Sequence, residues 1–480
     1  MAADILDLDA TGQLTALASK RISAVELLQL SLAREAQTHA RLNAVVTKDP
    51  ERALTRAAAI DDLRAKGAPL GVLAGLPMTI KDTLDVVGMP ATSGLEAFKL
   101  RTAEDAMVVA HAKAAGAVIW GKTNVPVMAG DWQSFNDLYG TSNNPWDVTR
   151  TTGGSSGGAA SALATGVTAL EIGSDIGGSL RVPANFCGVF SHKPTWGLVS
   201  QIGHVPPAPG AHAERDLNVV GPMARSARDL RLMLGVLADA PTARLGEAAD
   251  LSTLKVGLWL DEPMFPLDPQ VRAVLARLAV ELAGQGAKVE TISSPVHIEQ
   301  LMGAYQVLLS SIIGVDMSPA QRKQMARMRA LANISEGLGV KLSPELAQLR
   351  AQTATHAEWL EADETRCRLR DSLATVFSRF DVILAPVTAV PAFPHDHKPF
   401  QSRKLKTSEG AEIPYISMLN WIALATACQL PATCVPAGLT AGGLPVGAQI
   451  IGPRGGDAKT LAVAQAIDEN IRGFVAPPQS

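Results

Sequence analysis

Hydrophobic residues along the chain follow two spacings, one typical of amphipathic helices and one typical of buried strands. The segment SAVELLQLSLAREA places Leu27, Leu28 and Leu32 on one helical face. It opens at Ser23, a residue type that caps helices. LAGLPMTIKD is instead a short continuous apolar run, which predicts a buried strand near Lys81. AEDAMVVAHAKAAGAVIWGKTN predicts a helix, a glycine turn and another strand.

The rest of the chain repeats this mixture of helical and strand patterns without a fixed period. Further strand candidates lie at 254–260, 288–292, 382–387, 432–435 and 446–451, with helical patterns between most of them. Interleaved helices and strands predict an α/β fold. A segment rich in proline and charge covers 385–415, and a loop of that length is typical of a site lid or of partial disorder.

Composition narrows the class of partner. The chain has 480 residues, 47% of them hydrophobic, and a formal net charge of −3. This content suffices for a large core, and neither half of the chain carries the basic patch that nucleic-acid binding requires. No cationic amphipathic face indicates a membrane surface. The expected partner is a small molecule.

Cysteine usage and the start of the chain predict a cytoplasmic location. The four cysteines form no CxxC pair and show no metal-ligand spacing, which favours reduced packing residues. The first ten residues are acidic and lack the features of a secretion signal, and no apolar run approaches about 18 residues.

Two motif matches do not fit their surroundings. Residues 116–123, GAVIWGKT, satisfy the phosphate-loop pattern, but Ala-Val-Ile-Trp in the middle predicts a strand that cannot wrap its amides around phosphate. Residues 153–157, GGSSG, match a nucleophile elbow with Ser155 as nucleophile, and His395 or His397 would then complete a Ser-Asp-His triad. An elbow must follow a strand, however, and the preceding NNPWDVTRTT predicts a turn.

A third constellation is more specific. TTGGSSGGAASALATGVTALEIGSDIGGSLRVPA, residues 151–184, combines a GGSSGG cluster with a GSDxGGSxRxPA segment, and Lys81 lies upstream in a G-x-P-x-x-x-K-D context. In these motifs and in the spacing of its two serines the chain resembles the amidase signature family. GTSNNPWD, FCGVFSHKPTWGLVS and LPATCVPAGLTAGGLPVGAQIIGP extend the resemblance, whereas roughly 235–410 matches only loosely.

The resemblance implies that Ser179 is the nucleophile, Ser155 the bridging serine and Lys81 the base, with no metal or organic cofactor. The chemistry agrees, because a serine hydroxyl is a poor nucleophile until a neighbouring base takes its proton. A lysine serves as that base only when neutral, and its free pKa of about 10.4 must therefore be lowered by burial. The apolar residues before Lys81 predict this burial. We expect Asp82 to face a backbone or arginine partner.

The glycines suit the stabilisation of a tetrahedral oxyanion by backbone N–H groups. By resemblance, the donors are the amides of Ile176, Gly177, Gly178 and Ser179. The resemblance also implies a cis peptide bond before Ser155. Ser156 and the small residues after it predict a helix whose N-terminus adds positive potential near the serines.

Other site roles follow from the resemblance alone. Asp175 and Arg181 are expected, with Ser156, to support the nucleophile loop. Met128, Ala129 and Gly130 are expected to contact the substrate through backbone carbonyls. Trp132, Phe135 and Tyr139 are candidates for lining the pocket or for plain packing.

One departure from the family bears on the substrate. Many relatives carry S-L-D-x-x-G-P after the KPT segment, whereas GHVPPAPGAHAERDLNVVGP stands here. The chain therefore fits a free-standing amidohydrolase for small amides, anilides or carbamates better than a glutamine-dependent tRNA amidotransferase A-type subunit. The amidotransferase subunit remains the alternative, and a non-catalytic binding protein on the same scaffold is a more remote alternative. Esterase or carbamate hydrolase activity is a possible side reaction.

The implied architecture is the amidase signature fold, α/β/α with a large central mixed β-sheet covered by helices. We expect a single domain over 1–480, working as a monomer or homodimer. Its expected parts are an N-terminal helical segment at 1–70, the signature core at 71–235, a variable, partly helical region at 236–410 and the C-terminal part of the core at 411–480.

Overall fold

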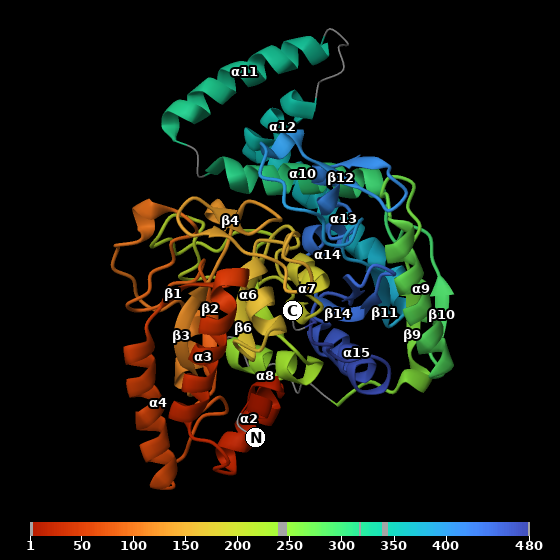
Figure 1. Ribbon diagram of the computed structural model, residues 1–480. Coiled ribbons are helices and arrows are strands. Elements are labelled where there is room, and N and C mark those ends of the chain that lie inside the picture. The colour runs from red at the N-terminus through yellow and green to blue at the C-terminus, as the bar shows by residue number, and fades with distance from the viewer. Residues whose placement is uncertain (1–2, 239–246, 316–317, 338–343, 479–480) are drawn as a thin grey trace.

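The computed structural model describes residues 3–238, 247–315, 318–337 and 344–478. Figure 1 shows the path of the chain through its helices and strands. The helices are α1 Ala3–Asp7, α2 Ala10–Ala18, α3 Ala24–Leu42, α4 Pro50–Ala65, α5 Met107–Ala114, α6 Gly157–Ala164, α7 Arg181–Cys187, α8 Ala227–Leu237, α9 Pro269–Gly284, α10 Ile298–Val315, α11 Pro319–Gly337, α12 Pro344–Gln352, α13 His356–Arg379, α14 Ala423–Ala427 and α15 Asp457–Asn470.

The strands form two main sheets and two short hairpins. They are β1 Val45–Lys48, β2 Pro77–Lys81, β3 Val118–Thr123, β4 Phe135–Asn136, β5 Gly140–Thr141, β6 Leu170–Asp175, β7 Phe190–Lys193, β8 Val219–Ala224, β9 Lys255–Leu258, β10 Lys288–Thr291, β11 Val382–Pro386, β12 Lys404–Lys406, β13 Glu412–Pro414, β14 Ala432–Leu439 and β15 Pro445–Ile451.

The central sheet is mixed and has eight strands in the order β10-β9-β11-β15-β14-β7-β8-β6. Strand β9 pairs in parallel with β10 and β11, whereas β14 and β15 pair antiparallel. Successive side chains of β11 enter different cores. Val382 and Leu384 pack with α8, α9 and α15, and Ile383 and Ala385 pack with α7, α10 and α14. Because side chains alternate across a strand, these cores cover the two faces of the sheet, which confirms the α/β/α prediction.

A smaller sheet, β1-β3-β2, carries Lys81 at the end of β2. It lies beside the central sheet, and the Thr79 hydroxyl of β2 donates to Glu171 Oε1 of β6 at 2.5 Å. The carboxyl ends of β2 and β6 therefore come together, at Lys81 and Asp175.

Most of the expected elements are present. Ser23 caps α3 in a capping box with Glu26, and the strands expected within 254–260, 288–292, 382–387, 432–435 and 446–451 appear as β9, β10, β11, β14 and β15. Two expectations need correction. Strand β1 interrupts the N-terminal segment expected to be helical, and the segment 385–415 contains the hairpin β12-β13.

Helices α10 to α13 lie within 235–410, the region of loose resemblance, and α11 extends away from the other elements at the top of Figure 1. Across the described ranges, no helix is both long and apolar enough to cross a membrane.

Candidate active site

Lys81 is the last residue of a strand whose five side chains are all buried. Its Nζ lies 2.7 Å from Ser155 Oγ, 2.9 Å from Ser174 Oγ and 3.4 Å from the Ser174 carbonyl oxygen. Burial lowers the pKa of Lys81 to about 7, although the negative charges of Asp175 and Glu171 act in the opposite direction. The shift has the direction expected from the apolar sequence, so a substantial fraction of Lys81 is neutral near pH 7.

Asp82, the next residue, points away from this amine. Its carboxylate accepts the Thr92 backbone N–H at 3.2 Å and pairs with Lys122 Nζ at 3.1 Å. The backbone partner was expected, but the charged partner is a lysine and not an arginine. Lys122 belongs to β3, so the middle of the phosphate-loop match is a buried strand, as its residues predicted.

The GGSSGG cluster forms a tight loop before α6. A Cβ atom on Gly154 would lie 2.4 Å from the Asp131 carbonyl oxygen, so only glycine fits there. The Gly154–Ser155 peptide bond is cis, as the resemblance implied. The Ser156 N–H donates to the Ser179 carbonyl oxygen at 3.2 Å, which joins the two serine-bearing loops.

The DIGGS loop connects β6 to α7, and the Asp175 side chain stabilises its conformation through hydrogen bonds. The Asp175 carboxylate accepts the backbone N–H groups of Gly178 and Leu180 at 2.9 and 3.1 Å. It also receives Arg181 Nε and Nη2 at 3.1 and 3.0 Å. Burial raises the pKa of Asp175, but the charge and hydrogen bonds of Arg181 outweigh it and keep the pKa below its ordinary value.

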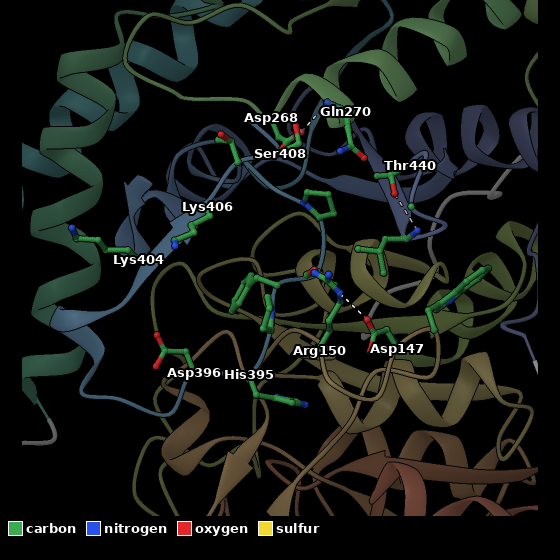
Figure 2. A pocket seen from close by; sticks show the side chains of 18 of the residues that line it. Asp147, Arg150, Asp268, Gln270, His395, Asp396, Lys404, Lys406, Ser408 and Thr440 are labelled. Carbon is green, nitrogen blue, oxygen red and sulfur yellow. Dashed lines mark hydrogen bonds and ion pairs between the residues drawn. The ribbon is translucent and has the colours of Figure 1, made fainter. Parts of the chain in front are cut away.

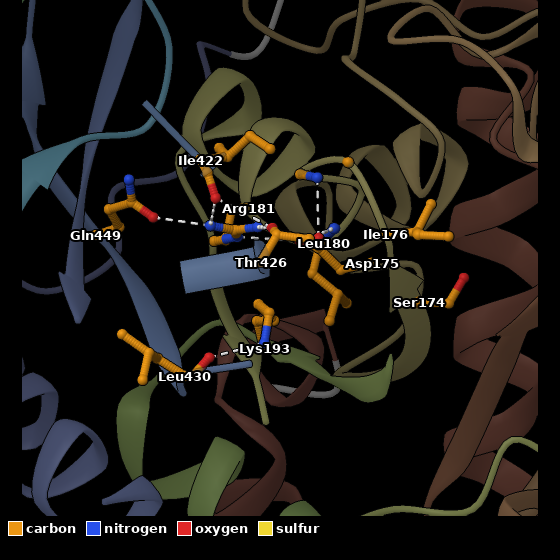
Figure 3. A network of polar contacts seen from close by, with 12 residues as sticks. Ser174, Asp175, Ile176, Leu180, Arg181, Lys193, Ile422, Thr426, Leu430 and Gln449 are labelled. Atoms are coloured by element: carbon orange, nitrogen blue, oxygen red, sulfur yellow. Dashed lines mark hydrogen bonds and ion pairs between the residues drawn. The ribbon is translucent and has the colours of Figure 1, made fainter. Parts of the chain in front are cut away.

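Arg181 is itself fully buried and connects this loop to distant parts of the chain. Figure 3 shows its guanidinium between α14 and β15, where it donates to Thr426 Oγ1 at 2.7 Å and to Gln449 Oε1 at 2.9 Å. The Asp175–Arg181 pair therefore anchors the DIGGS loop to the central sheet.

The backbone amides of the DIGGS loop fall into two groups. The amides of Ile176, Gly177 and Ser179 donate to no residue in the described part of the chain, whereas the Gly178 amide donates to Asp175. The expectation that Gly178 serves as an oxyanion donor is therefore corrected. With φ at +93°, Gly178 turns its own N–H inward to the carboxylate.

Ser179 opens onto a pocket of about 440 Å³. Its walls come from the DIGGS loop, the end of η2 (Val127–Ala129) and the residues after it, helices α10 and α12, η4 (Phe400–Ser402) and the region after β13. The lining residues are Ala129, Gly130, Asp131, Trp132, Ile176, Gly177, Ser179, Met302, Gly303, Tyr305, Gln306, Leu309, Ser310, Ile313, Gln348, Phe400, Ile416, Leu419 and Asn420. Of the expected contacts, Ala129, Gly130 and Trp132 belong to this wall, and Met128, Phe135 and Tyr139 do not.

Among the residues that the structure describes, the pocket wall contains one charged side chain, Asp131, and it already has partners. Its Oδ2 receives Arg403 Nη1 at 2.5 Å and its Oδ1 receives the Tyr415 hydroxyl at 2.6 Å. The remaining wall is apolar, aromatic or neutral and polar. The pocket therefore suits an uncharged, largely apolar ligand.

Two residues beside Lys81 escaped the sequence analysis. Ser174, in the GSD triplet, accepts from Lys81, and His204 Nε2 lies 2.8 Å from Ser174 Oγ. His204 stands in the GHVPP segment that we interpreted only as part of the substrate entrance. Its position beside Lys81 depends on pairing between remote loops, since Val205 N–H donates to the Thr83 carbonyl oxygen at 2.7 Å.

The histidines that the sequence singled out lie elsewhere. Buried His192 contacts Thr433 Oγ1 at 2.9 Å and Asp457 Oδ1 at 3.1 Å, which is a structural role. His395 and His397 line a separate polar pocket of about 1080 Å³, and Figure 2 shows His395 there near Arg150 and Asp147. The Ser155 hydroxyl contacts Lys81 instead, and the preceding strand, β5, ends at Thr141 and does not lead into the serine, so the elbow interpretation fails.

Comparisons with known proteins agree with this geometry. The family model described as Amidase matches residues 26–461. The chain is 33% identical to an indoleacetamide hydrolase of Bradyrhizobium diazoefficiens, over 96% of this chain and 86% of that protein. It is 32% identical to the A-type subunit of the glutamyl-tRNA(Gln) amidotransferase of a Cyanothece species, over 91% and 92% of the two chains.

A solved structure supports the same assignment. A bacterial aryl acylamidase of the amidase signature enzymes superimposes with a TM-score of 0.79 and 26% identity, over 97% of this chain and 96% of that one. The chain therefore belongs to the amidase signature family and is an enzyme that acts on an amide C–N bond.

Proposed function

We propose that the protein is a free-standing amidohydrolase that cleaves uncharged small amides, anilides or carbamates through an acyl-enzyme on Ser179. One observation carries the proposal: a buried lysine amine lies 2.7 Å from the Ser155 hydroxyl, in a loop whose Ser156 N–H donates to the Ser179 carbonyl oxygen, and the described residues of the pocket onto which Ser179 opens include no unpaired charge. A nucleophile, a base and an orienting group within reach of one another are what acyl transfer requires.

In the proposed mechanism, Ser179 Oγ attacks the substrate carbonyl carbon. Its proton passes to Ser155 Oγ while the Ser155 proton passes to Nζ of neutral Lys81. A C–O bond forms, and the carbonyl π electrons move onto oxygen. The amides of Ile176, Gly177 and Ser179 are the proposed donors to this oxyanion, because they alone in the DIGGS loop are uncommitted.

Collapse of the intermediate restores the C=O bond and breaks the C–N bond. The proton held by Lys81 returns through Ser155 to the departing nitrogen, so the amine leaves neutral and Lys81 is neutral again. Water then attacks the ester by the same relay, which releases the acid and restores Ser179. Amides need this returned proton more than activated esters do, because an amine is a poor leaving group.

The pocket favours neutral substrates over glutamine. Free glutamine carries an α-ammonium and an α-carboxylate, and both need partners when they leave water. The charged wall residue Asp131 is occupied by Arg403 and Tyr415. Apolar side chains of α10, including Met302, Leu309 and Ile313, instead offer contacts to an aryl or alkyl group.

A second candidate is a glutamine-dependent amidotransferase subunit. It is supported by the 32% identity to the Cyanothece protein over nearly the full length of both chains. Such a subunit would take its nitrogen from glutamine and would work with companion subunits and an aminoacyl-tRNA. We also propose a cytoplasmic location, which four free cysteines favour.

The deciding experiment measures amine or ammonia release by the purified chain alone from three substrates: 4-nitroacetanilide, an aryl carbamate and glutamine. The proposal expects turnover of the anilide or the carbamate and little release from glutamine. Turnover of glutamine without any turnover of the synthetic substrates would favour the amidotransferase instead.

A further inference from the structure

We propose that His204 is a positioning residue that, through Ser174, makes Lys81 a hydrogen-bond acceptor for Ser155. The inference rests on the proposed Lys81–Ser155–Ser179 relay. It adds two members to that relay, neither of which touches the substrate. A continuous series of hydrogen bonds links the Pro206 carbonyl to Lys81 through these two residues.

The first bond assigns the tautomer of His204. Its Nδ1 lies 2.6 Å from the Pro206 carbonyl oxygen, and a carbonyl oxygen can only accept. The hydrogen of the neutral ring therefore sits on Nδ1, and Nε2 is an acceptor. Burial and the charge of Lys81 lower the pKa of His204 to about 3, so the ring is neutral at the pH values at which enzymes of this kind are assayed.

The second bond orients the Ser174 hydroxyl. His204 Nε2 lies 2.8 Å from Ser174 Oγ, and the acceptor nitrogen requires the single hydroxyl hydrogen. Ser174 Oγ therefore turns its lone pairs toward Lys81 Nζ, 2.9 Å away. The histidine thus determines that Ser174 accepts from the lysine and does not donate to it.

The third step concerns the amine. As an ammonium, Lys81 has three N–H bonds for three contacts: Ser174 Oγ, the Ser174 carbonyl oxygen and Ser155 Oγ. A neutral amine keeps two N–H bonds and gains one lone pair. Both Ser174 oxygens can only accept, so the lone pair must face Ser155. Neutral Lys81 is then oriented to receive the Ser155 proton.

Lys81, Ser174 and His204 are all buried, and backbone hydrogen bonds join their segments. Ser174 is at the end of β6, and the His204 segment pairs with the chain just after Lys81, where Asp85 N–H donates to the Gly203 carbonyl oxygen at 3.0 Å. The other ionisable groups that act on Lys81 are Asp175 and Glu171. Burial raises the pKa of Glu171 to about 8, which limits the negative charge that it presents to Lys81 near neutral pH.

The test uses two matched variants of His204 and the rate at which a fluorophosphonate labels Ser179. Labelling forms a Ser179 O–P bond, expels fluoride and sends the serine proton through Ser155 to Lys81. His204→Asn keeps an amide near the Nδ1 position, able to bond Pro206, but is too short to reach Ser174. His204→Gln places its Oε1 near the Nε2 position and can accept from Ser174.

We expect His204→Asn and Ser174→Ala each to slow labelling about 10- to 100-fold, less than the roughly 10²- to 10⁴-fold that a general acid or base itself contributes. His204→Gln should stay within about fivefold of the parent. The double variant His204→Asn/Ser174→Ala should be no slower than Ser174→Ala alone, because His204 acts through Ser174. On an anilide substrate the loss should appear in kcat, with KM within about threefold.

The inference would be overturned if the rate losses of the two single variants multiplied in the double variant. It would also be overturned if His204→Asn were labelled at the parent rate. Equal losses in the Asn and Gln variants would also overturn it, since they would indicate a packing role. Thermal unfolding of each variant shows whether it is folded. If Ser179→Ala is still labelled and active, the proposed function fails. If Ser179→Ala is inert but the His204 and Ser174 variants do not behave as expected, the proposed function stands and the inference about His204 does not.

Discussion

Lys81 and Lys193 are both fully buried and both interact electrostatically with Asp175, but only Lys81 contacts hydroxyl groups. Burial lowers the pKa of both Lys81 and Lys193 to about 7. Lys81 contacts the hydroxyls of Ser155 and Ser174. Lys193 donates to the carbonyl oxygens of Pro194 and Leu430 at 2.9 and 2.7 Å, the second of which Figure 3 marks.

The comparison separates a shifted pKa from a chemical role. Carbonyl oxygens have no proton to give, so Lys193 acts only as a donor that joins β7 to the segment before β14. Lys81 faces a hydroxyl that can lose its proton. A buried lysine with a lowered pKa is therefore a candidate base only where its contacts include an exchangeable proton.

The largest effect is expected at the nucleophile. Ser179→Ala should lower kcat/KM on the anilide or carbamate by more than about 10⁴-fold, because no acyl-enzyme can form. A fluorophosphonate should label the parent once per chain, with peptide mapping placing the label on Ser179. His395→Ala is the matched control and should stay within about twofold. Mapping of the label to Ser155 would contradict the assignment.

Lys81→Ala should be nearly as damaging to amide hydrolysis, with a loss of about 10³- to 10⁴-fold, because both proton transfers pass through this amine. The variant should retain a larger fraction of its activity on a 4-nitrophenyl ester, whose leaving group needs no proton. Parallel assays on the amide and the ester measure the difference. Amide hydrolysis near the parent rate would exclude Lys81 as the base.

The pH dependence should report Lys81 and not Lys193. The active form needs a neutral Lys81, so kcat/KM should fall about tenfold per pH unit below the lysine pKa of about 7 and level off above it. The same acidic limb should persist in Lys193→Met. If the acidic limb disappears in Lys193→Met on the same substrate, the titration belongs to Lys193 and the assignment to Lys81 is wrong.

A much smaller effect than that of Lys81→Ala is expected at Lys193 itself. Lys193→Met should keep kcat/KM within about tenfold, because the amine contacts only backbone carbonyls and no group of the relay. The labelling rate of Ser179 by the fluorophosphonate should change equally little. A loss as large as that of Lys81→Ala would show that the two lysines do not differ as their contacts indicate.

Local sequence was sufficient to predict those elements whose structure depends on one short segment. The apolar run before Lys81 predicted a buried strand and a lowered lysine pKa, and both are observed. Ser23 and Glu26 are three residues apart and cap α3 by themselves. The strands β6, β7 and β8 were not anticipated, because glycine, proline and polar residues interrupt their apolar runs. Their strand conformation depends on burial in the central sheet.

The residues themselves determined the family resemblance, the α/β class and the three side chains of the proposed relay, because the two glycine-rich motifs and the lysine context lie within short stretches. The tertiary structure decided what depends on remote contacts. It directed the Gly178 amide to Asp175, closed the pocket with α10, and brought His204 to Ser174. A hydrogen bond between residues 30 positions apart requires both loops to be placed first, and no local pattern records that placement.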